Sequence, residues 1–131
     1  MLLTTAIAVA TLAEPAAARL QLAHLVPEAR IHVALDGRLD RIHGTTLATG
    51  HSPEASTTAF INEHLDLWNL QVNELEPVGP FPTGQHTVGI MFDRATDTFK
   101  FTGHYWRQVR DGYPVHDTRL MLLVRNLEGS P

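Results

Sequence analysis

Residues 98–126, TFKFTGHYWRQVRDGYPVHDTRLMLLVRN, decide the fold of this chain. The runs 98–110 and 113–126 are rich in aromatic and β-branched side chains, which favour strands, and Asp111-Gly112 between them is a two-residue turn signal. A third run of the same kind, 85–93, precedes them across a short link at 94–97. Because links this short join antiparallel neighbours, the sequence predicts a three-stranded antiparallel meander.

The lengths of the two links predict which residues face each other across the meander. A two-residue turn at Asp111-Gly112 places Arg110 opposite Tyr113. Continuing both registers gives three further expected pairs: His104 with Arg119, His116 with Arg107, and His86 with Tyr105 across the link at 94–97. Arginine beside histidine disfavours a cation site, so this register argues against metal binding.

A hairpin is expected before the meander. Ile31 and Val33 alternate with polar or small residues, Asp36-Gly37 tolerates a tight turn, and Ile42 resumes the extended pattern.

A helix is expected after the hairpin. Ser52 is a good N-cap and Pro53 suits the first helical position. One mostly apolar stripe then recurs at steps of three and four residues: Thr57, Phe60, Ile61, His64, Leu65 and Trp68. This spacing predicts an amphipathic helix of about four turns.

The order of hairpin, helix and meander indicates an α+β fold. Strands and helices do not alternate, so we expect an antiparallel β-sheet with one long amphipathic helix packed on a face. We divide the chain into residues 1–18, a probable signal peptide, 19–51, an N-terminal segment with the hairpin, and 52–128, the main α+β domain. The expected role of Trp68 and Trp106 is to fill the layer between helix and sheet.

The N-terminal stretch 1–18, MLLTTAIAVATLAEPAAA, is typical of a secretory signal. Leu2 to Leu12 is an uncharged, mostly apolar run, and Ala16 to Ala18 provide small residues for a cleavage site. The sequence therefore predicts a secreted, periplasmic or cell-envelope protein. The alternative is an ordinary N-terminal helix, because no Lys or Arg precedes the apolar run.

Composition excludes several classes of function. The net charge is −4 and the basic residues are scattered, so nucleic acid is not an expected partner. No apolar run is long enough to span a membrane. The 8 His lack the paired spacing of zinc enzymes, and the chain has no Cys and no Gly-x-Ser-x-Gly motif. We expect no metal, no cofactor and no nucleophilic catalysis.

A general acid–base pair remains an alternative. A curved sheet with a helix across it can enclose a pocket that binds a small molecule, as a cyclase or dehydratase requires. The candidates would be His64 on the helix and His86, Tyr105 or Asp117 on the sheet.

The strand and turn of the meander carry a family resemblance. The pattern comprises Trp106, Arg107, Gln108, Gly112, Tyr113, Pro114 and Val115, followed by the alternating Leu120, Leu122 and Val124. With the helix start at Ala59 and Phe60, residues 52–128 resemble the fungalysin/thermolysin propeptide (FTP) domain family.

The resemblance implies a cystatin/PepSY-like fold and a non-catalytic role. The chain would be the propeptide of a secreted thermolysin- or fungalysin-type zinc metallopeptidase, acting as intramolecular chaperone and inhibitor that keeps the zymogen inactive. Its partner would be the peptidase catalytic domain, downstream in the same chain or on a separate one. The motif residues Trp106, Gln108, Gly112, Tyr113, Pro114 and Val115 would then form the partner-binding hairpin.

Overall fold

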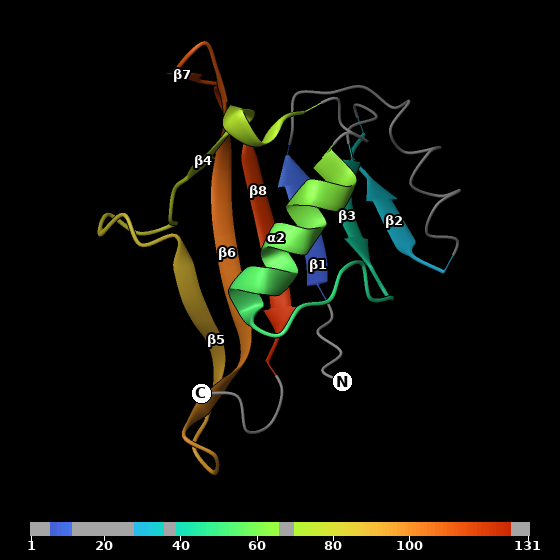
Figure 1. Ribbon diagram of the computed structural model, residues 1–131, viewed down its shortest axis with the longest axis vertical. Helices are drawn as coiled ribbons and strands as arrows, with labels where there is room; N and C mark the ends of the chain where they lie inside the picture. The colour runs from blue at the N-terminus through green and yellow to red at the C-terminus, as the bar shows by residue number, and fades with distance from the viewer. Residues whose placement is uncertain (1–5, 12–27, 36–38, 66–69, 127–131) are drawn as a thin grey trace.

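A computed structural model describes residues 6–11, 28–35, 39–65 and 70–126. These residues form an antiparallel β-sheet with one α-helix across a face, which confirms the α+β prediction (Figure 1). The elements are β1 (Ala6–Thr11), β2 (Arg30–Val33), β3 (Leu39–His43), α2 (Pro53–His64), the 3₁₀ turn η2 (Val72–Glu74), β4 (Leu75–Pro77), β5 (Thr87–Asp93), β6 (Thr98–Arg110), β7 (Tyr113–Pro114) and β8 (Arg119–Arg125). The strand order is β2-β3-β1-β8-β6-β4, and β5 and β7 also pair with β6.

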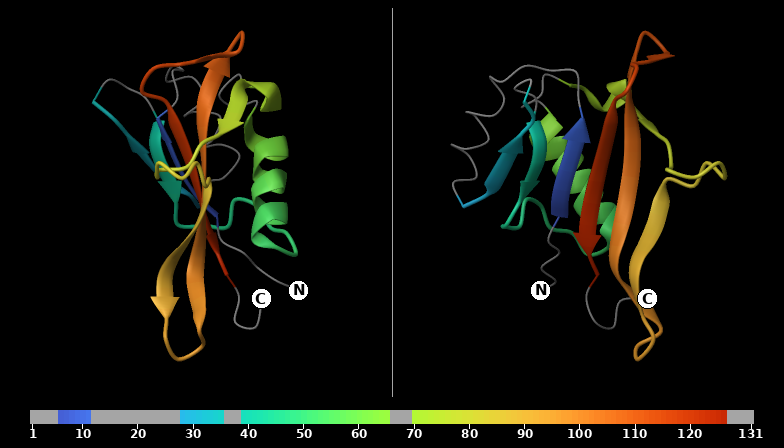
Figure 2. Two further views of the ribbon diagram at one scale, coloured as in Figure 1. Left: turned by 90° about the vertical axis from the view of Figure 1, so that its left-hand side faces the viewer. Right: turned by 180° about the vertical axis from the view of Figure 1, so that it is seen from behind.

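The predicted meander is β5, β6 and β8. Both β5 and β8 pair antiparallel with β6, which is the longest described strand. The backbone N–H of Tyr105 donates to the carbonyl of His86 at 2.9 Å, as the link at 94–97 predicts. Arg110 pairs with Tyr113, so the two-residue turn is also confirmed. The far end of the β5–β6 hairpin extends beyond the part of the sheet that α2 covers (Figure 2).

The predicted register beyond that turn is wrong. Trp106 pairs with Leu120 rather than with Asp117, a shift of three residues from the register that the turn starts. Consequently His104 lies opposite Leu122 and not Arg119, and His116 lies outside the strands and not opposite Arg107.

The cause of the shift is an irregular segment between β7 and β8. The backbone N–H of Val115 donates to the carbonyl of Gln108 at 2.9 Å. The Thr118 hydroxyl then donates to the carbonyl of Val115 and accepts from the N–H of Gln108. Asp117 has a positive φ of 55°, a conformation that short polar residues tolerate. These local bonds compete with the ladder and displace the strand.

The hairpin of β2 and β3 is confirmed, and β1 joins it to the meander. β1 pairs antiparallel with β3 on one side and with β8 on the other (Figure 2). It lies within residues 1–18, whose role as a signal peptide stays a prediction. The hairpin turn at Asp36-Gly37 lies outside the described residues.

The helix α2 begins where the sequence predicts and is shorter than predicted. The Ser52 side chain accepts from the N–H of Ala55 at 3.1 Å, which confirms the N-cap. The helix has 12 residues, and Trp68, expected in the same stripe, lies outside the described residues. Phe60 is 1% exposed and packs α2 onto the sheet. The core cluster contains Ile42, Leu47, Ala48, Phe60, Leu65, Leu70, Leu120 and Leu122.

Candidate ligand site under the helix

The face of β6 that looks toward α2 carries polar side chains in the middle of the core. Alternate residues of a strand share a face, so His104, Trp106 and Gln108 point the same way. His104 and Trp106 lie opposite Leu122 and Leu120, which belong to the core beneath α2. His104 is 2% exposed and Gln108 is fully buried. The inner face of β6 therefore buries polar groups where apolar ones are expected.

Several of these buried polar atoms have no hydrogen-bond partner among the described residues. They are Oγ1 of Thr57 on α2, Nδ1 of His86, Nε2 of His104, and both amide atoms of Gln108. We call Thr57, His86, His104 and Gln108 the inner polar set. Leaving one such atom unpaired costs about 1–3 kcal/mol, and native proteins pair nearly all of them. Water or a ligand can supply the missing hydrogen bonds of the inner polar set.

Three rings near this part of β6 lie close together. The ring centroids of His86 and His104 are 6.4 Å apart, and each is about as far from the indole of Trp106, at 6.0 and 5.9 Å. The rings of His104 and Trp106 are nearly parallel, with an angle of 15° between their planes. The other ring nitrogen of His104, Nδ1, lies 3.5 Å from Oγ1 of Thr87, which is long for a hydrogen bond.

Burial lowers the pKa of His104 below its ordinary value of 6.5. The neighbouring His86 lowers it further, while the Glu54 carboxylate raises it. Since the lowering causes prevail, His104 is neutral at pH 7, and a neutral imidazole has one ring nitrogen that accepts a proton. The arrangement can therefore bind a ligand by hydrogen bonds and accept a proton from it.

The residues predicted for an acid–base pair are dispersed, with His86 as the exception. Nε2 of His64 is 2.9 Å from the carbonyl of Leu47 and is occupied there. Tyr105 alternates with His104 and so points to the opposite face of β6, and Asp117 is exposed in the β7–β8 connection. His86 instead meets His104, which the sequence placed opposite an arginine. The alternation of His104, Trp106 and Gln108 along the strand could have indicated a shared face. The predicted register, which is wrong by three residues, instead placed His104 opposite Arg119.

The six motif residues fall into two places. Trp106 and Gln108 lie on the inner face of β6, with Gln108 fully buried. Gly112, Tyr113, Pro114 and Val115 form the turn beyond it, where Tyr113 is 77% exposed. The structure therefore does not bring the motif together as one surface.

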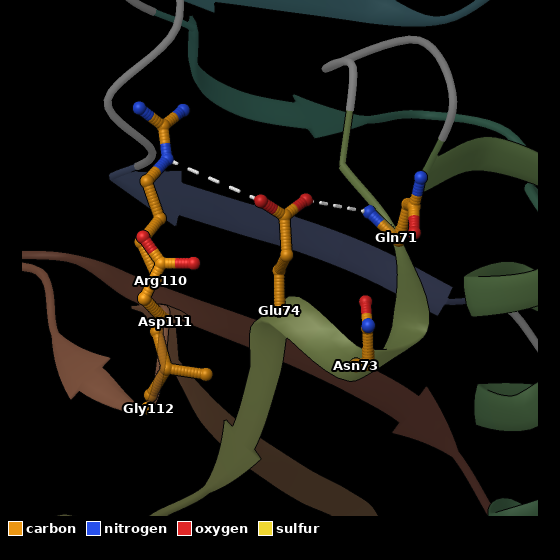
Figure 3. Close-up of a pocket in the computed structure, with 7 residues that line it drawn as sticks. Gln71, Asn73, Glu74, Arg110, Asp111 and Gly112 are labelled. Atoms are coloured by element: carbon orange, nitrogen blue, oxygen red, sulfur yellow. Dashed lines mark hydrogen bonds and ion pairs between the residues drawn. The ribbon is translucent and has the colours of Figure 1, made fainter.

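A polar hollow of about 600 Å³ lies beside that turn (Figure 3). Its lining is Gln71, Asn73, Glu74, Val109, Arg110, Asp111 and Gly112. Glu74 lies at its centre: one carboxylate oxygen accepts from the N–H of Gln71 at 2.9 Å and the other is 4.0 Å from Nε of Arg110. These polar groups interact with one another, unlike those of the inner polar set. The hollow is therefore a weaker candidate for a ligand-binding site.

The described part of the chain contains no cluster of three or more His, Cys, Asp or Glu that could hold a metal ion. It also contains no helix that is long and apolar enough to cross a membrane. Comparison of the chain with family models, with curated proteins and with solved structures finds no match.

Proposed function

We propose that this chain is a small-molecule-binding domain whose ligand binds to the inner polar set of β6 and its neighbours. This proposal rests on the inner polar set, whose buried atoms have no hydrogen-bond partner among the described residues. A purely structural core gains nothing from burying an amide and two imidazole nitrogens unpaired, because each lowers its stability. A ligand that supplies the missing hydrogen bonds removes this cost.

The same site suits proton transfer of the cyclase or dehydratase kind. His104 is neutral and buried, and Nε2 is its unpaired nitrogen. In such a step the C–H bond next to a ligand carbonyl breaks, and the proton moves to Nε2 of His104. The bonding electron pair forms the enolate, whose charge lies on oxygen, where a hydrogen-bond donor of the site can stabilise it.

The test is a thermal-shift screen of small uncharged compounds against the full chain and its Gln108→Met variant. Methionine has a similar length and volume but no amide. We expect compounds that raise the melting temperature of the wild type, because a ligand at about 100 times its Kd adds about 2.7 kcal/mol. The same compounds should have little effect on the variant. Equal shifts in both proteins, or no shift from any compound, would contradict the proposal.

A second candidate function is the propeptide role that the family resemblance implies. It is supported by the exposed turn at 110–115, where Tyr113 is 77% exposed and available to a partner. In this proposal a cystatin/PepSY-like, exported module presents the turn to the catalytic domain of a metallopeptidase, while Trp106 and Gln108 only support the strand.

The propeptide role predicts inhibition of a thermolysin-type peptidase and a higher refolding yield of that enzyme. Tyr113→Ser should weaken both effects, whereas Gln85→Ser, at another exposed position, should not. If several such peptidases are neither inhibited nor assisted in refolding by the wild-type chain, this candidate is excluded.

A further inference from the structure

We infer that the free edge of β5 pairs with the same edge of a second copy of this chain. Three apolar side chains are exposed on the hairpin of β5 and β6, and we call them the β5 patch: Met91, Phe92 and Phe99. They are 61%, 51% and 44% exposed respectively. The inference does not depend on the proposed ligand site. It uses the state of the strand edge and the packing, charge and area of the patch.

The edge of β5 is open to a further strand. Among the described residues β5 pairs only with β6, so its other side has no neighbouring strand there. The other two edges of the sheet are protected: β2 has a bulge between His32 and Val33, and β4 is three residues long and ends at Pro77. By contrast β5 has 7 residues and contains no Pro, Lys or Arg. Such an edge is a template for another strand.

The side chains of the β5 patch are held together beside this edge. The rings of Phe92 and Phe99 meet edge to face, with their centroids 5.2 Å apart. The ring of Phe99 also lies over Gly89, because a Cβ at that position would collide with it. Met91 interrupts the pairing with β6 and has a positive φ of 59°, which bulky residues rarely adopt. The hairpin extends beyond the part of the sheet that α2 covers, so the helix leaves this end of it bare (Figure 2).

A second copy fits this edge by symmetry and by charge. Two β5 strands that pair antiparallel about a two-fold axis place the same patch on both sides of the contact. The hairpin 87–101 contains two acidic and two basic residues: Asp93, Asp97, Arg94 and Lys100. These charges cancel, whereas the whole chain carries −4. Identical hairpins therefore do not repel each other, and the patch offers no excess charge to a strongly charged partner.

The exposed area of the patch sets the expected strength of the pairing. An aromatic side chain buries about 150–250 Å² when it is fully covered, so the three exposed fractions correspond to roughly 300 Å² per copy. Stable interfaces bury about 1,200–2,000 Å² from both partners together. Two patches supply about half of the smaller figure, and the paired backbone edges add to it. We therefore expect a weak dimer, with a Kd in the micromolar range or above.

The mass of the full chain as a function of its concentration tests this inference. In sedimentation experiments from about 1 to about 500 μM, the average mass should rise from that of one chain toward that of two. Because the patch is apolar and its hairpin carries no net charge, raising NaCl from about 50 to about 500 mM should not weaken the association. The mass of a single chain at every concentration overturns the inference and leaves the open edge to a strand of another protein.

Two variants locate the contact. Met91→Lys places a charge on the edge strand, and Phe92→Ser removes one ring of the patch, so each should raise the Kd of the dimer about tenfold or more. Val72→Lys and Tyr113→Ser are the matched controls, since these residues are 57% and 77% exposed and lie outside β5. The controls should leave the Kd within about twofold. Circular dichroism and urea denaturation check that each variant is folded.

A cysteine at position 91 separates pairing at β5 from other self-association. The chain contains no Cys, so a disulfide in Met91→Cys forms only between two copies. Oxidised at about 100 μM, Met91→Cys should form a covalent dimer much faster than Val72→Cys, because residues near a two-fold axis lie close to their own copies. Equal rates in the two proteins, or a dimer that Met91→Lys and Phe92→Ser leave unchanged, would place the contact elsewhere and overturn the inference.

Discussion

Two histidine pairs in the same sheet have opposite hydrogen-bonding states. On the β2–β3 hairpin, His32 and His43 stack with their centroids 5.0 Å apart, and their Nε2 atoms are 2.9 Å from each other. At β6, the ring centroids of His86 and His104 are 6.4 Å apart. Nδ1 of His86 and Nε2 of His104 are buried without a partner among the described residues.

The difference shows that burial and missing partners, rather than paired histidines as such, mark a candidate site. The exposed pair satisfies one nitrogen of each ring within the pair, and water can reach the rest. In the buried pair, Nδ1 of His86 and Nε2 of His104 are shielded from bulk water and have no partner among the described residues. Both pairs consist of the same residue type, so only the packing of the sheet separates an ordinary surface pair from a buried pair with unpaired nitrogens.

The largest expected effect comes from breaking the sheet between the two pairs. β1 joins the strand that carries His43 to β8, which pairs with the strand that carries His104. Val9→Pro removes a ladder hydrogen bond in a central strand, a position that does not tolerate proline, and should strongly lower the free energy of unfolding. Removal of residues 1–18 should abolish cooperative unfolding, measured by circular dichroism during urea denaturation.

A chain that starts at Arg19 and unfolds as cooperatively as the full chain would contradict this prediction. That result would mean that β1 is not needed for the fold, and it would favour the secretory-signal interpretation of residues 1–18. Loss of the transition in both altered chains would instead mean that cleavage after Ala18 removes a strand of the sheet.

The next largest effect concerns the unpaired amide of the buried site. Gln108→Met should raise the free energy of unfolding by about 1–2 kcal/mol, because it removes two buried unsatisfied atoms and keeps the packing volume. Gln85→Met is the control, since Gln85 is exposed and the same change there should stay within about 0.5 kcal/mol. Urea denaturation measures both. A marked loss of stability in Gln108→Met would show that the amide has a structural partner.

Much of the fold could be predicted from local sequence signals. The N-cap at Ser52, the turn at Asp111-Gly112 and the link at 94–97 each specify a conformation through their own residues. These predictions are confirmed at Ala55, Tyr113 and Tyr105 respectively. Signals that act within a few residues can be read without the rest of the chain.

The site could not be predicted because it depends on longer-range facts. The register of His104 is changed by side-chain bonds of Thr118, which no turn rule anticipates. The pairing of β1 with β3 and β8 joins segments far apart in the chain, and an apolar run such as Ala6–Thr11 suits a signal peptide as well as a strand. The sequence therefore identified His86 as a candidate but not its neighbour.

The pH dependence of stability gives a smaller effect that separates the two pairs. The folded pKa of His104 lies below its ordinary value of 6.5, so the unfolded chain binds more protons as the pH falls below about 7. Stability should therefore decrease with falling pH and level off below the folded pKa. One group contributes at most about 1.4 kcal/mol per pH unit. Denaturation at a series of pH values from 7 to 4 measures the slope.

Two variants test which histidine causes the change of stability with pH. His104→Phe should flatten it most, because His104 is 2% exposed. The pKa of His43 is also lowered, by desolvation and by nearby His32, Arg30 and Arg41, so His43→Gln should flatten the slope slightly. If His104→Phe leaves the slope unchanged, His104 is not held neutral by its burial, and its assignment as proton acceptor is wrong.

The smallest expected effect is the coupling within the exposed pair. In a double-mutant cycle of His32→Ala and His43→Ala, the interaction energy should be below about 0.5 kcal/mol, because water replaces the lost hydrogen bond at the surface. The cycle of His86→Ala and His104→Ala should show a larger coupling, since these rings share a site that water does not freely enter. A coupling above about 1 kcal/mol in the exposed pair would contradict this prediction. A surface contact would then contribute as much as the buried rings, and burial would not be the property that distinguishes the two pairs.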